Sequence, residues 1–181
     1  MQNILTEYLE TPHLIIRNST FNDIQELQSV CDGWDEKKYL EGDLFDYNYI
    51  EKCLLSGDLP PLDNANKEYY RIKTICSKKD LKIVGFFDIY HGYPKTTSIW
   101  ISILLIRKEM QKNGFGKEVI EAIAAQGREK KYASLGIGVH LKNWKALRFW
   151  RKNGFDKISD IYGDYDFGEN NFSIIRLEKS L

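Results

Sequence analysis

Three β-rich stretches joined by short turns occupy the middle of the chain, and they constrain the fold more than any other feature. They read "YYRIKTIC", "KIVGFFDIY" and "SIWISILLI", with the turns "SKKD" and "HGYPKT" between them. Connections this short join strands that run in opposite directions, because a parallel pair needs a crossover of a dozen or more residues. Segment 69–106 therefore predicts an antiparallel meander at the centre of a sheet.

The flanking segments carry both helix and strand patterns. Hydrophobic residues from Phe115 to Ala124 recur at helical spacing, which predicts an amphipathic helix over about 114–131. Further helices are expected over about 20–31, over a broken stretch at 36–55 and over 143–153, and further strands at "HLIIRNST", "ASLGIGVHL", "FDKISDIYGDYDF" and "FSIIRLEKS". This order predicts an α/β (α+β) fold in one domain, residues 1–181, with a mixed, mostly antiparallel sheet of about seven strands flanked by about four helices.

Composition excludes several classes of protein. Lys plus Arg and Asp plus Glu both number 26, so no net charge attracts nucleic acid. No apolar run approaches the roughly 20 residues of a membrane span, and "MQNILTEYLETPHL" lacks the pattern of a secretory signal, so we expect a cytoplasmic protein. Cys31, Cys53 and Cys76 are odd in number and far apart, which predicts reduced, buried thiols and no metal site.

The segment "QKNGFG", residues 111–116, contains two glycines, Gly114 and Gly116. No side chain therefore covers the backbone at these positions, where the predicted helix 114–131 begins. A helix N-terminus has unpaired N–H groups and a partial positive charge, so a phosphate is stabilised there. The side chains of Gln111, Lys112 and Lys117 add donors and charge. The alternative is that the glycines only form a turn into a surface helix.

Two common phosphate-binding patterns are absent from this segment. Gly116-Lys117 is followed by Glu118, which departs from the nucleoside triphosphatase loop G-x-x-x-x-G-K-[ST]. The residue three after Gly116 is Val119, and the preceding strands form an antiparallel meander, so a dinucleotide-binding βαβ unit is also excluded.

The segment "QKNGFG" after "ISILLI" resembles the Arg/Gln-x-x-Gly-x-Gly acetyl-coenzyme A signature of the GNAT N-acetyltransferases. Residues 139–155, "VHLKNWKALRFWRKNGF", are similar to that family's second motif, with a strand, an Asn, an Ala three residues on, an aromatic pair and a Gly-Phe that ends a helix. The resemblance covers roughly 69–181 in detail and the first third of the chain by the arrangement of elements. It implies a GNAT-like fold and acetyl-coenzyme A as the cofactor.

The resemblance also implies a set of cofactor-binding residues. They are Leu104, Ile106, Gln111, Lys112, Asn113, Gly114, Phe115, Gly116, Lys117, Asn143, Ala146 and Trp150. Backbone groups near Leu104 and Ile106 would pair with the pantetheine amides, and the 111–117 amides would hold the pyrophosphate. Asn143, Ala146 and Trp150 share one helical face, which suits a thin pantetheine arm, although a plain amphipathic helix packed on a sheet has the same pattern.

One departure from the family pattern concerns the general acid. Many members carry tyrosine in the second position of the aromatic pair, whereas this chain has Phe149-Trp150. Indole nitrogen is a donor that does not act as an acid near neutral pH. Because a thiol has a pKa near 8.5, the thiolate is a tolerable leaving group without that acid.

The base that deprotonates the amine is expected to be Asp88 or His140, each of which also has a structural interpretation. Other candidates are His91, Tyr162 and Tyr165. His91 and Tyr93 lie at a turn, and we expect both to be ordinary surface residues. Asp88 lies between apolar strand residues, so its carboxylate must face solvent or a polar cleft.

The resemblance places the amine acceptor between N-terminal helices and the late hairpin. These are the stretches "YLEGDLFDYNYI" and "SDIYGDYDFGEN", with "GDLPP" at 57–61 as a possible wall. Asp160, Asp164 and Asp166 could attract a cationic amine or form a solvated loop.

The sequence therefore favours an acetyl-coenzyme A-dependent N-acetyltransferase whose acceptor is a primary amine on a small molecule or peptide, attacked directly in a ternary complex. A homodimer is possible, and neither nucleic acid nor membrane is an expected partner. The alternatives are a non-catalytic acyl-coenzyme A binding or sensing module, which Trp150 keeps open, and a structural α/β domain without a cofactor.

Overall fold

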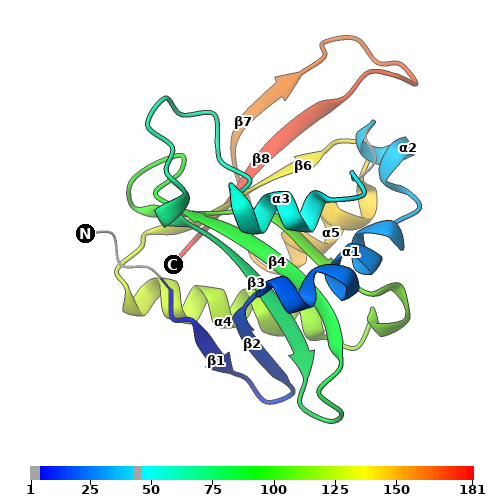
Figure 1. The fold of residues 1–181 in the computed structure, drawn as a ribbon. Helices are drawn as coiled ribbons and strands as arrows, with labels where there is room; N and C mark the ends of the chain where they lie inside the picture. Colours follow the sequence, from blue (N-terminus) through cyan, green and yellow to red (C-terminus); the bar gives the residue numbers. More distant parts are fainter. Residues whose placement is uncertain (1–4, 43–45) are drawn as a thin grey trace.

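The computed structural model describes residues 5–42 and 46–181, and these form one eight-stranded sheet with helices on both faces. The strands are β1 (Tyr8–Glu10), β2 (Leu14–Asn18), β3 (Tyr70–Ser77), β4 (Ile83–His91), β5 (Ser98–Ile106), β6 (Ser134–His140), β7 (Lys157–Gly163) and β8 (Ser173–Ser180). Their order across the sheet is β1-β2-β3-β4-β5-β6-β8-β7 (Figure 1). The predicted meander is β3-β4-β5, and each of its pairs is antiparallel.

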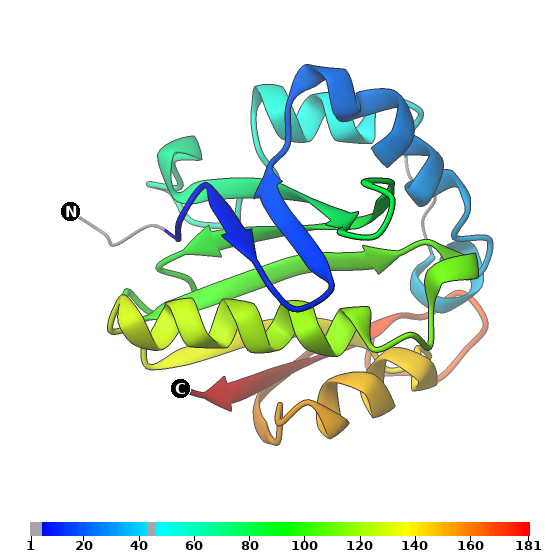
Figure 2. The same ribbon diagram turned by 90° about the horizontal axis from the view of Figure 1, so that it is seen from below.

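Five α-helices lie within the described residues. They are α1 (Ile24–Asp32), α2 (Lys37–Glu41), α3 (Tyr49–Leu55), α4 (Phe115–Glu129) and α5 (Trp144–Lys152). Helices α4 and α5 cover one face of the sheet, whereas α1 and α3 cover the other (Figure 2). None of the helices in this part of the chain is both long and apolar enough to cross a bilayer.

Two hydrophobic clusters join the helices to the sheet. The larger contains Val119, Ile120 and Ile123 of α4, with Trp150 of α5. The smaller packs Leu27 and other α1 side chains with residues of α3 and the opposite sheet face. Burial on both faces explains why the central strands are nearly continuous hydrophobic runs rather than alternating ones.

Strands β5 and β6 form the one parallel pair among the described strands, and their pairing is short. It runs from Ser98↔Ser134 to Ile101↔Ile137 and ends there, although β5 continues to Ile106. The connection between them contains α4, as a parallel crossover requires. The half of β5 beyond Ile101 therefore has β4 on one side and an open edge on the other.

The predicted fold class is confirmed, with small differences in the number of elements. Eight strands and five helices are described where about seven and about four were expected. Strand β1 has three residues, too few for a recognisable pattern. The stretch 36–55 is broken as expected, because Gly42 ends α2 with a φ of 80°; residues 43–45 lie outside the described residues.

The surface position predicted for His91 is wrong. Strand β4 extends to this residue, and its side chain is fully buried. Nδ1 lies 2.8 Å from the Tyr69 carbonyl oxygen, and Nε2 accepts a hydrogen bond from the Leu5 N–H at 3.2 Å. Burial lowers the pKa of His91 to about 4, so this histidine is a neutral part of the core.

The prediction that the three cysteines are reduced, buried thiols is confirmed. Cys31, Cys53 and Cys76 are free thiols, and all three are buried. Burial raises the pKa of each thiol, which makes them poor nucleophiles.

Replacement of Phe155 tests the packing that supports α5. Its ring is fully buried and meets Trp150 edge to face, with the ring centroids 4.8 Å apart. We expect Phe155→Ala to lower the free energy of unfolding by about 3–5 kcal/mol in urea titrations. Phe167→Ala is the control, since the Phe167 side chain is 99% exposed, and its effect should stay within about 0.5 kcal/mol. Equal effects would contradict this account of the core.

Candidate active site

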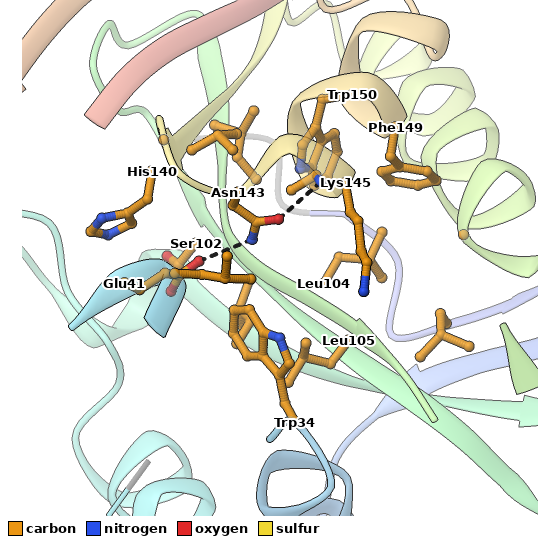
Figure 3. Close-up of a pocket in the computed structure, with 18 of the residues that line it drawn as sticks. Trp34, Glu41, Ser102, Leu104, Leu105, His140, Asn143, Lys145, Phe149 and Trp150 are labelled. Carbon is orange, nitrogen blue, oxygen red and sulfur yellow. Dashed lines mark hydrogen bonds between the residues drawn. The ribbon is translucent and has the colours of Figure 1, made fainter. Parts of the chain in front are cut away.

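A cavity of about 1300 Å³ extends from the N-terminus of α4, along the open edge of β5, to the inner side of the β7–β8 hairpin. Its walls are β5, β6, α5 and the segment around α2 (Figure 3). Most of the predicted cofactor-binding residues line it. They are Leu104, Ile106, Gln111, Lys112, Gly114, Phe115, Gly116, Lys117, Asn143, Ala146 and Trp150.

The α4 N-terminus presents free backbone donors to this cavity. The first hydrogen bond of the helix runs from the Glu118 N–H to the Gly114 oxygen at 3.0 Å, so the N–H groups of residues 115–117 have no intrahelical acceptor. Gly114 adopts a φ of 85°, and a Cβ built on it would meet nothing within 4 Å. An anion therefore has both donors and space at this point.

The reason for glycine at position 116 differs from the reason at position 114. A Cβ on Gly116 would lie 2.9 Å from Cζ of Phe149 on α5. Glycine at 116 therefore allows α4 and α5 to pack closely, whereas Gly114 opens into the cavity.

Side chains near the α4 N-terminus hold the loop rather than fill the anion site. Gln111 donates through Nε2 to the Ile106 oxygen at 3.0 Å, and Asn113 donates through Nδ2 to the Met110 oxygen at 3.1 Å. Asn113, a predicted cofactor residue, is not among the cavity-lining residues. The Glu118 carboxylate is turned toward the β1–β2 connection, where the His13 N–H donates to it at 2.8 Å. The negative charge of Glu118 is thus directed away from the free N–H groups.

The open edge of β5 carries backbone groups that β6 does not pair. The Ile103 N–H donates to the Asp88 carboxylate at 3.0 Å, and the Arg107 N–H donates to the Val84 oxygen at 2.9 Å, so both face β4. Backbone groups alternate along a strand, so those of Leu104 and Ile106 face the cavity. The Gln111 bond to the Ile106 oxygen comes from that side. The edge can therefore pair with an extended ligand that carries amides.

Helix α5 borders the same edge, and Asn143 fixes its start. The Asn143 side chain is buried, and Oδ1 accepts from the Ala146 N–H at 3.0 Å as an N-cap. Nδ2 lies 3.4 Å from Oε1 of Glu41 (Figure 3). Asn143 thus joins α5 to α2 across the cavity, and Ala146 leaves room next to it.

Trp150 is mainly a core residue. It is 5% exposed and packs edge to face with Phe149 and Phe155, at centroid distances of 5.2 and 4.8 Å. It lines the cavity with the small part of the indole that stays accessible. Its main effect is to hold α5 against the sheet.

Asp88 is buried beneath the open edge at a β-bulge. Asp88 pairs with Ile103 and Ile89 with Ile101, so Ser102 is an extra residue on β5. The Asp88 carboxylate accepts from the Ile103 N–H at 3.0 Å and from the Tyr70 hydroxyl at 2.7 Å. Ser102, whose hydroxyl also interacts with this carboxylate, lines the cavity, whereas Asp88 itself does not.

Burial determines the protonation of Asp88. Desolvation, helped by the nearby charge of Asp58, raises the pKa of Asp88 from 3.8 to about 7, against the opposing hydrogen bonds. Asp58 lies on the cavity wall formed by 57–61, where the sequence predicted one. A buried carboxyl group that titrates near neutral pH, next to a serine at the cavity surface, can exchange a proton with a ligand.

Only some of the other catalytic candidates line the cavity. His140 lines the cavity, and its ring packs against Phe172 with centroids 6.2 Å apart. Tyr162 also lines the cavity, whereas Tyr165 is fully exposed and lies outside it. Of the three hairpin aspartates, Asp160 lines the cavity. Asp164 instead accepts from the Phe172 N–H at 2.7 Å within the hairpin.

Sequence reasoning missed several cavity residues. Tyr93 was expected at the surface, but it lines the cavity and packs edge to face with Trp100 at a centroid distance of 5.1 Å. Trp34, Ser102 and Arg176 also line it. The position of Ser102 depends on the bulge and that of Arg176 on the β8 register, and neither feature has a short sequence signature.

Segment 35–41 closes one side of the cavity through charged contacts. Glu36 pairs with Lys145 of α5 at 2.6 Å, and Asp35 lies 3.5 Å from Lys108, which precedes α4. These contacts join the residues just before α2 to α5 and to the loop that connects β5 with α4. Two of the three acidic side chains of this segment, Asp35 and Glu36, therefore lie next to lysines of the cavity wall, whereas the third, Glu41, contacts Asn143.

The described residues hold no group of three or more His, Cys, Asp or Glu side chains placed to bind a metal ion.

The raised pKa of Asp88 predicts a pH-dependent stability. The folded protein keeps this proton up to about pH 7, whereas the unfolded chain loses it near pH 3.8, so the free energy of unfolding falls as the pH rises through this window because only the unfolded chain releases the proton. We expect the free energy of unfolding of the wild type, relative to Asp88→Asn, to fall by a few kcal/mol over that window and then level off. Taking the difference cancels the opposite contribution of His91.

Urea titrations at several pH values measure this difference. Asp80→Asn, in the turn after β3, is the control for the loss of one acidic side chain. A wild-type minus Asp88→Asn difference that does not change with pH would show that Asp88 is ionised throughout.

Comparisons with a family model and with solved structures point to the same protein family. The model of the acetyltransferase (GNAT) family matches residues 22–155. No curated protein matches the chain. A probable GNAT-family acetyltransferase from Chromobacterium violaceum is 12% identical, with a TM-score of 0.77 over 99% of this chain and 89% of that one.

Two other solved structures share the fold. Spermidine N-acetyltransferase from Vibrio cholerae, in complex with CoA and spermine, is 14% identical, with a TM-score of 0.68 over 94% of this chain and 96% of that one. Ribosomal-protein-alanine N-acetyltransferase from Brucella melitensis is 16% identical, with a TM-score of 0.66 over 92% and 99%. With the family match over well more than half of its length, the chain belongs to the acetyltransferase (GNAT) family, whose enzymes use acetyl-coenzyme A.

Proposed function

We propose that the protein transfers the acetyl group of acetyl-coenzyme A to a primary amine by direct attack in a ternary complex. One observation carries the proposal. A single cavity joins the free N–H groups of α4, the unpaired edge of β5 and a region lined by His140, Asp160 and Arg176 beyond the point where β5 and β6 part. Both reactants can therefore lie side by side, which supplies much of the acceleration of a bimolecular reaction.

The residues present fit coenzyme A. Gly114 opens into free space next to three unpaired N–H groups, as a pyrophosphate requires. Lys108, Lys112 and Lys117 line the same end of the cavity and add positive charge. The edge of β5 at Leu104 and Ile106 suits the amides of a pantetheine arm, with Ala146 on the opposite wall.

When bound, acetyl-coenzyme A supplies an activated acetyl group as a thioester, whose C–S bond breaks as the new N–C bond forms. Backbone N–H groups of the open β5 edge are placed to donate to a carbonyl oxygen, which stabilises negative charge there. The chain forms no covalent bond in this scheme.

Asp88, acting through Ser102, is the base that we favour. The attacking amine must lose a proton, and Asp88 with a pKa of about 7 can take it near neutral pH. The Ser102 hydroxyl lies between this buried carboxylate and the cavity, so it can pass the proton on. His140, on the cavity wall, is the second candidate, and loss of the pH dependence of kcat/KM in His140→Gln but not in Asp88→Asn would select it.

The leaving thiolate needs no acid from α5. Trp150 occupies the position where many family members have tyrosine, and its indole is packed in the core. A thiol pKa near 8.5 allows the thiolate to leave and take its proton from water.

The rival function is a non-catalytic acyl-coenzyme A sensor, and the absence of tyrosine at position 150 is the observation that favours it. A sensor and an enzyme both bind the cofactor, but only an enzyme releases thiol. A cytoplasmic location and a homodimer stay predictions from the sequence.

Charge at Gly114 tests the cofactor site. A side chain there points into open space, so Gly114→Glu places a negative charge where the pyrophosphate is expected without a clash inside the protein. We expect acetyl-coenzyme A to bind at least tenfold more weakly to Gly114→Glu than to Gly114→Gln, which has the same size and the same backbone strain. Calorimetric titration measures both affinities. Equal affinities would show that the pyrophosphate does not bind next to Gly114.

Thiol release tests the reaction. With acetyl-coenzyme A and a panel of primary amines, we expect at least one amine to give stoichiometric free thiol and acetylated product. Ser102→Ala should lower kcat with little change in cofactor affinity, because it interrupts the path to Asp88. Tight cofactor binding without release for any amine would favour the sensor.

A further inference from the structure

An arginine enclosed by aromatic rings forms one wall of the cavity at the end away from α4. The Arg176 guanidinium lies 5.7 Å from the ring centroids of Tyr93 and Trp100, and 5.4 Å from that of Tyr162. All four side chains line the cavity, and that of Arg176 is 19% exposed. A cation in such a box is held by the ring faces and is largely removed from bulk water.

The guanidinium has donors to spare. Arginine carries five N–H donors, and its planar fork matches a carboxylate. Nη2 donates to the Tyr93 hydroxyl at 3.2 Å, and Nη1 lies 3.4 Å from the Asp160 carboxylate, which is a loose ion pair. The buried Nε has no hydrogen-bond partner in the described part of the chain. The Tyr162 hydroxyl also interacts with the guanidinium, and none of the three partners is held in the bidentate geometry that arginine favours.

Arg176 is also close to the place of reaction. Its register partner on β6 is Gly138, the residue after Ile137, where β5 and β6 part. Opposed residues of antiparallel strands have Cα atoms about 4.5–5.5 Å apart. A Cβ on Gly138 would lie 3.1 Å from Cγ2 of Ile174, 3.3 Å from the Tyr162 hydroxyl and 3.5 Å from the Trp100 ring, so glycine at this position allows the rings of the box to pack closely against β6.

We propose that Arg176, with the hydroxyl of Tyr93, binds a carboxylate of the acceptor, so that the acceptor is a small amine carrying a carboxylate a few bonds from the nitrogen. This inference rests on the proposed acetyl transfer to an amine. An amino acid has the required pair of groups. Polyamines and internal lysine side chains of proteins lack the anion.

The charges of the cavity support this choice over a polycationic acceptor. Glu36 lies next to Lys145 and Asp35 next to Lys108, so this part of the wall has as many lysines as carboxylates and offers no net negative charge to a polycation. Asp160 is the one carboxylate near Arg176 for which a contact is described, and its side chain is 46% exposed, which weakens its hold on the guanidinium. A planar anion can therefore compete with Asp160 for the fork.

Pairs of acceptors that differ only in charge test the proposal. The probes are the standard amino acids and their carboxamides, which keep the amine but lose the carboxylate. We expect wild-type kcat/KM, measured by thiol release, to be at least tenfold higher for the best amino acid than for its amide. In Arg176→Gln and Arg176→Lys the KM for that amino acid should rise at least tenfold, with little change for the amide.

Arg128→Gln, on the far turn of α4, is the matched control and should leave both acceptors unchanged. The wild-type comparison needs no variant, so the proposal stays testable if loss of Arg176 disturbs the fold. Faster acetylation of amides, spermidine or a peptide N-terminus than of every amino acid would overturn it. An equal loss for acid and amide in the Arg176 variants would also overturn it.

Calorimetry separates this proposal from the proposed function. The chain is saturated with coenzyme A and titrated with the amino acid and its amide. Selective binding of the amino acid without thiol release would support the carboxylate site and contradict the enzyme. Thiol release from amines without any preference for a carboxylate would do the reverse.

Discussion

The separation of β5 from β6 after Ile101 and Ile137 is the constraint on which the site depends. A sheet whose central strands stay paired has no room for a ligand, and its backbone groups are satisfied internally. Here the last residues of β5 keep β4 as a neighbour and expose their other edge to a cavity of about 1300 Å³. The free N–H groups of α4 lie at one end of that edge, and the Arg176 box lies at the other. The cavity thus has an end suited to phosphates and an end suited to an acceptor.

The buried Asp88 ties this geometry to the chemistry. Its carboxylate accepts the Ile103 N–H at the bulge, so it stabilises the local shape of β5. The same burial raises its pKa to about 7, which gives a group able to exchange a proton next to Ser102. One side chain therefore serves both structure and the proposed proton transfer. The stability lost between pH 3.8 and about pH 7, where only the unfolded chain releases this proton, is the cost of keeping a base at this position.

Much of the fold could be predicted from sequence, and the site only in part. The meander and α4 have strong periodic patterns, and the two family motifs predict the starts of α4 at Gly114 and of α5 at Asn143. His91 was misplaced because a histidine before a glycine and a proline looks like a turn residue, whereas the strand continues and its imidazole finds two buried partners. Trp150 lines the cavity and stays a predicted cofactor residue, although most of its ring packs against Phe155 in the core, which its place in the motif does not indicate. Arg176 was not identified because its environment depends on aromatic residues from two other strands, β5 and β7, and from the β4–β5 connection.

Calorimetric titration of the wild-type protein with acetyl-coenzyme A and with acetylpantetheine, which lacks the diphosphate, tests the central claim most directly. The account predicts micromolar binding of acetyl-coenzyme A and at least tenfold weaker binding of acetylpantetheine, because only the former reaches the free N–H groups of α4. Equal affinities would contradict the placement of the pyrophosphate. No binding of either compound would mean that the open edge of β5 is not a cofactor site.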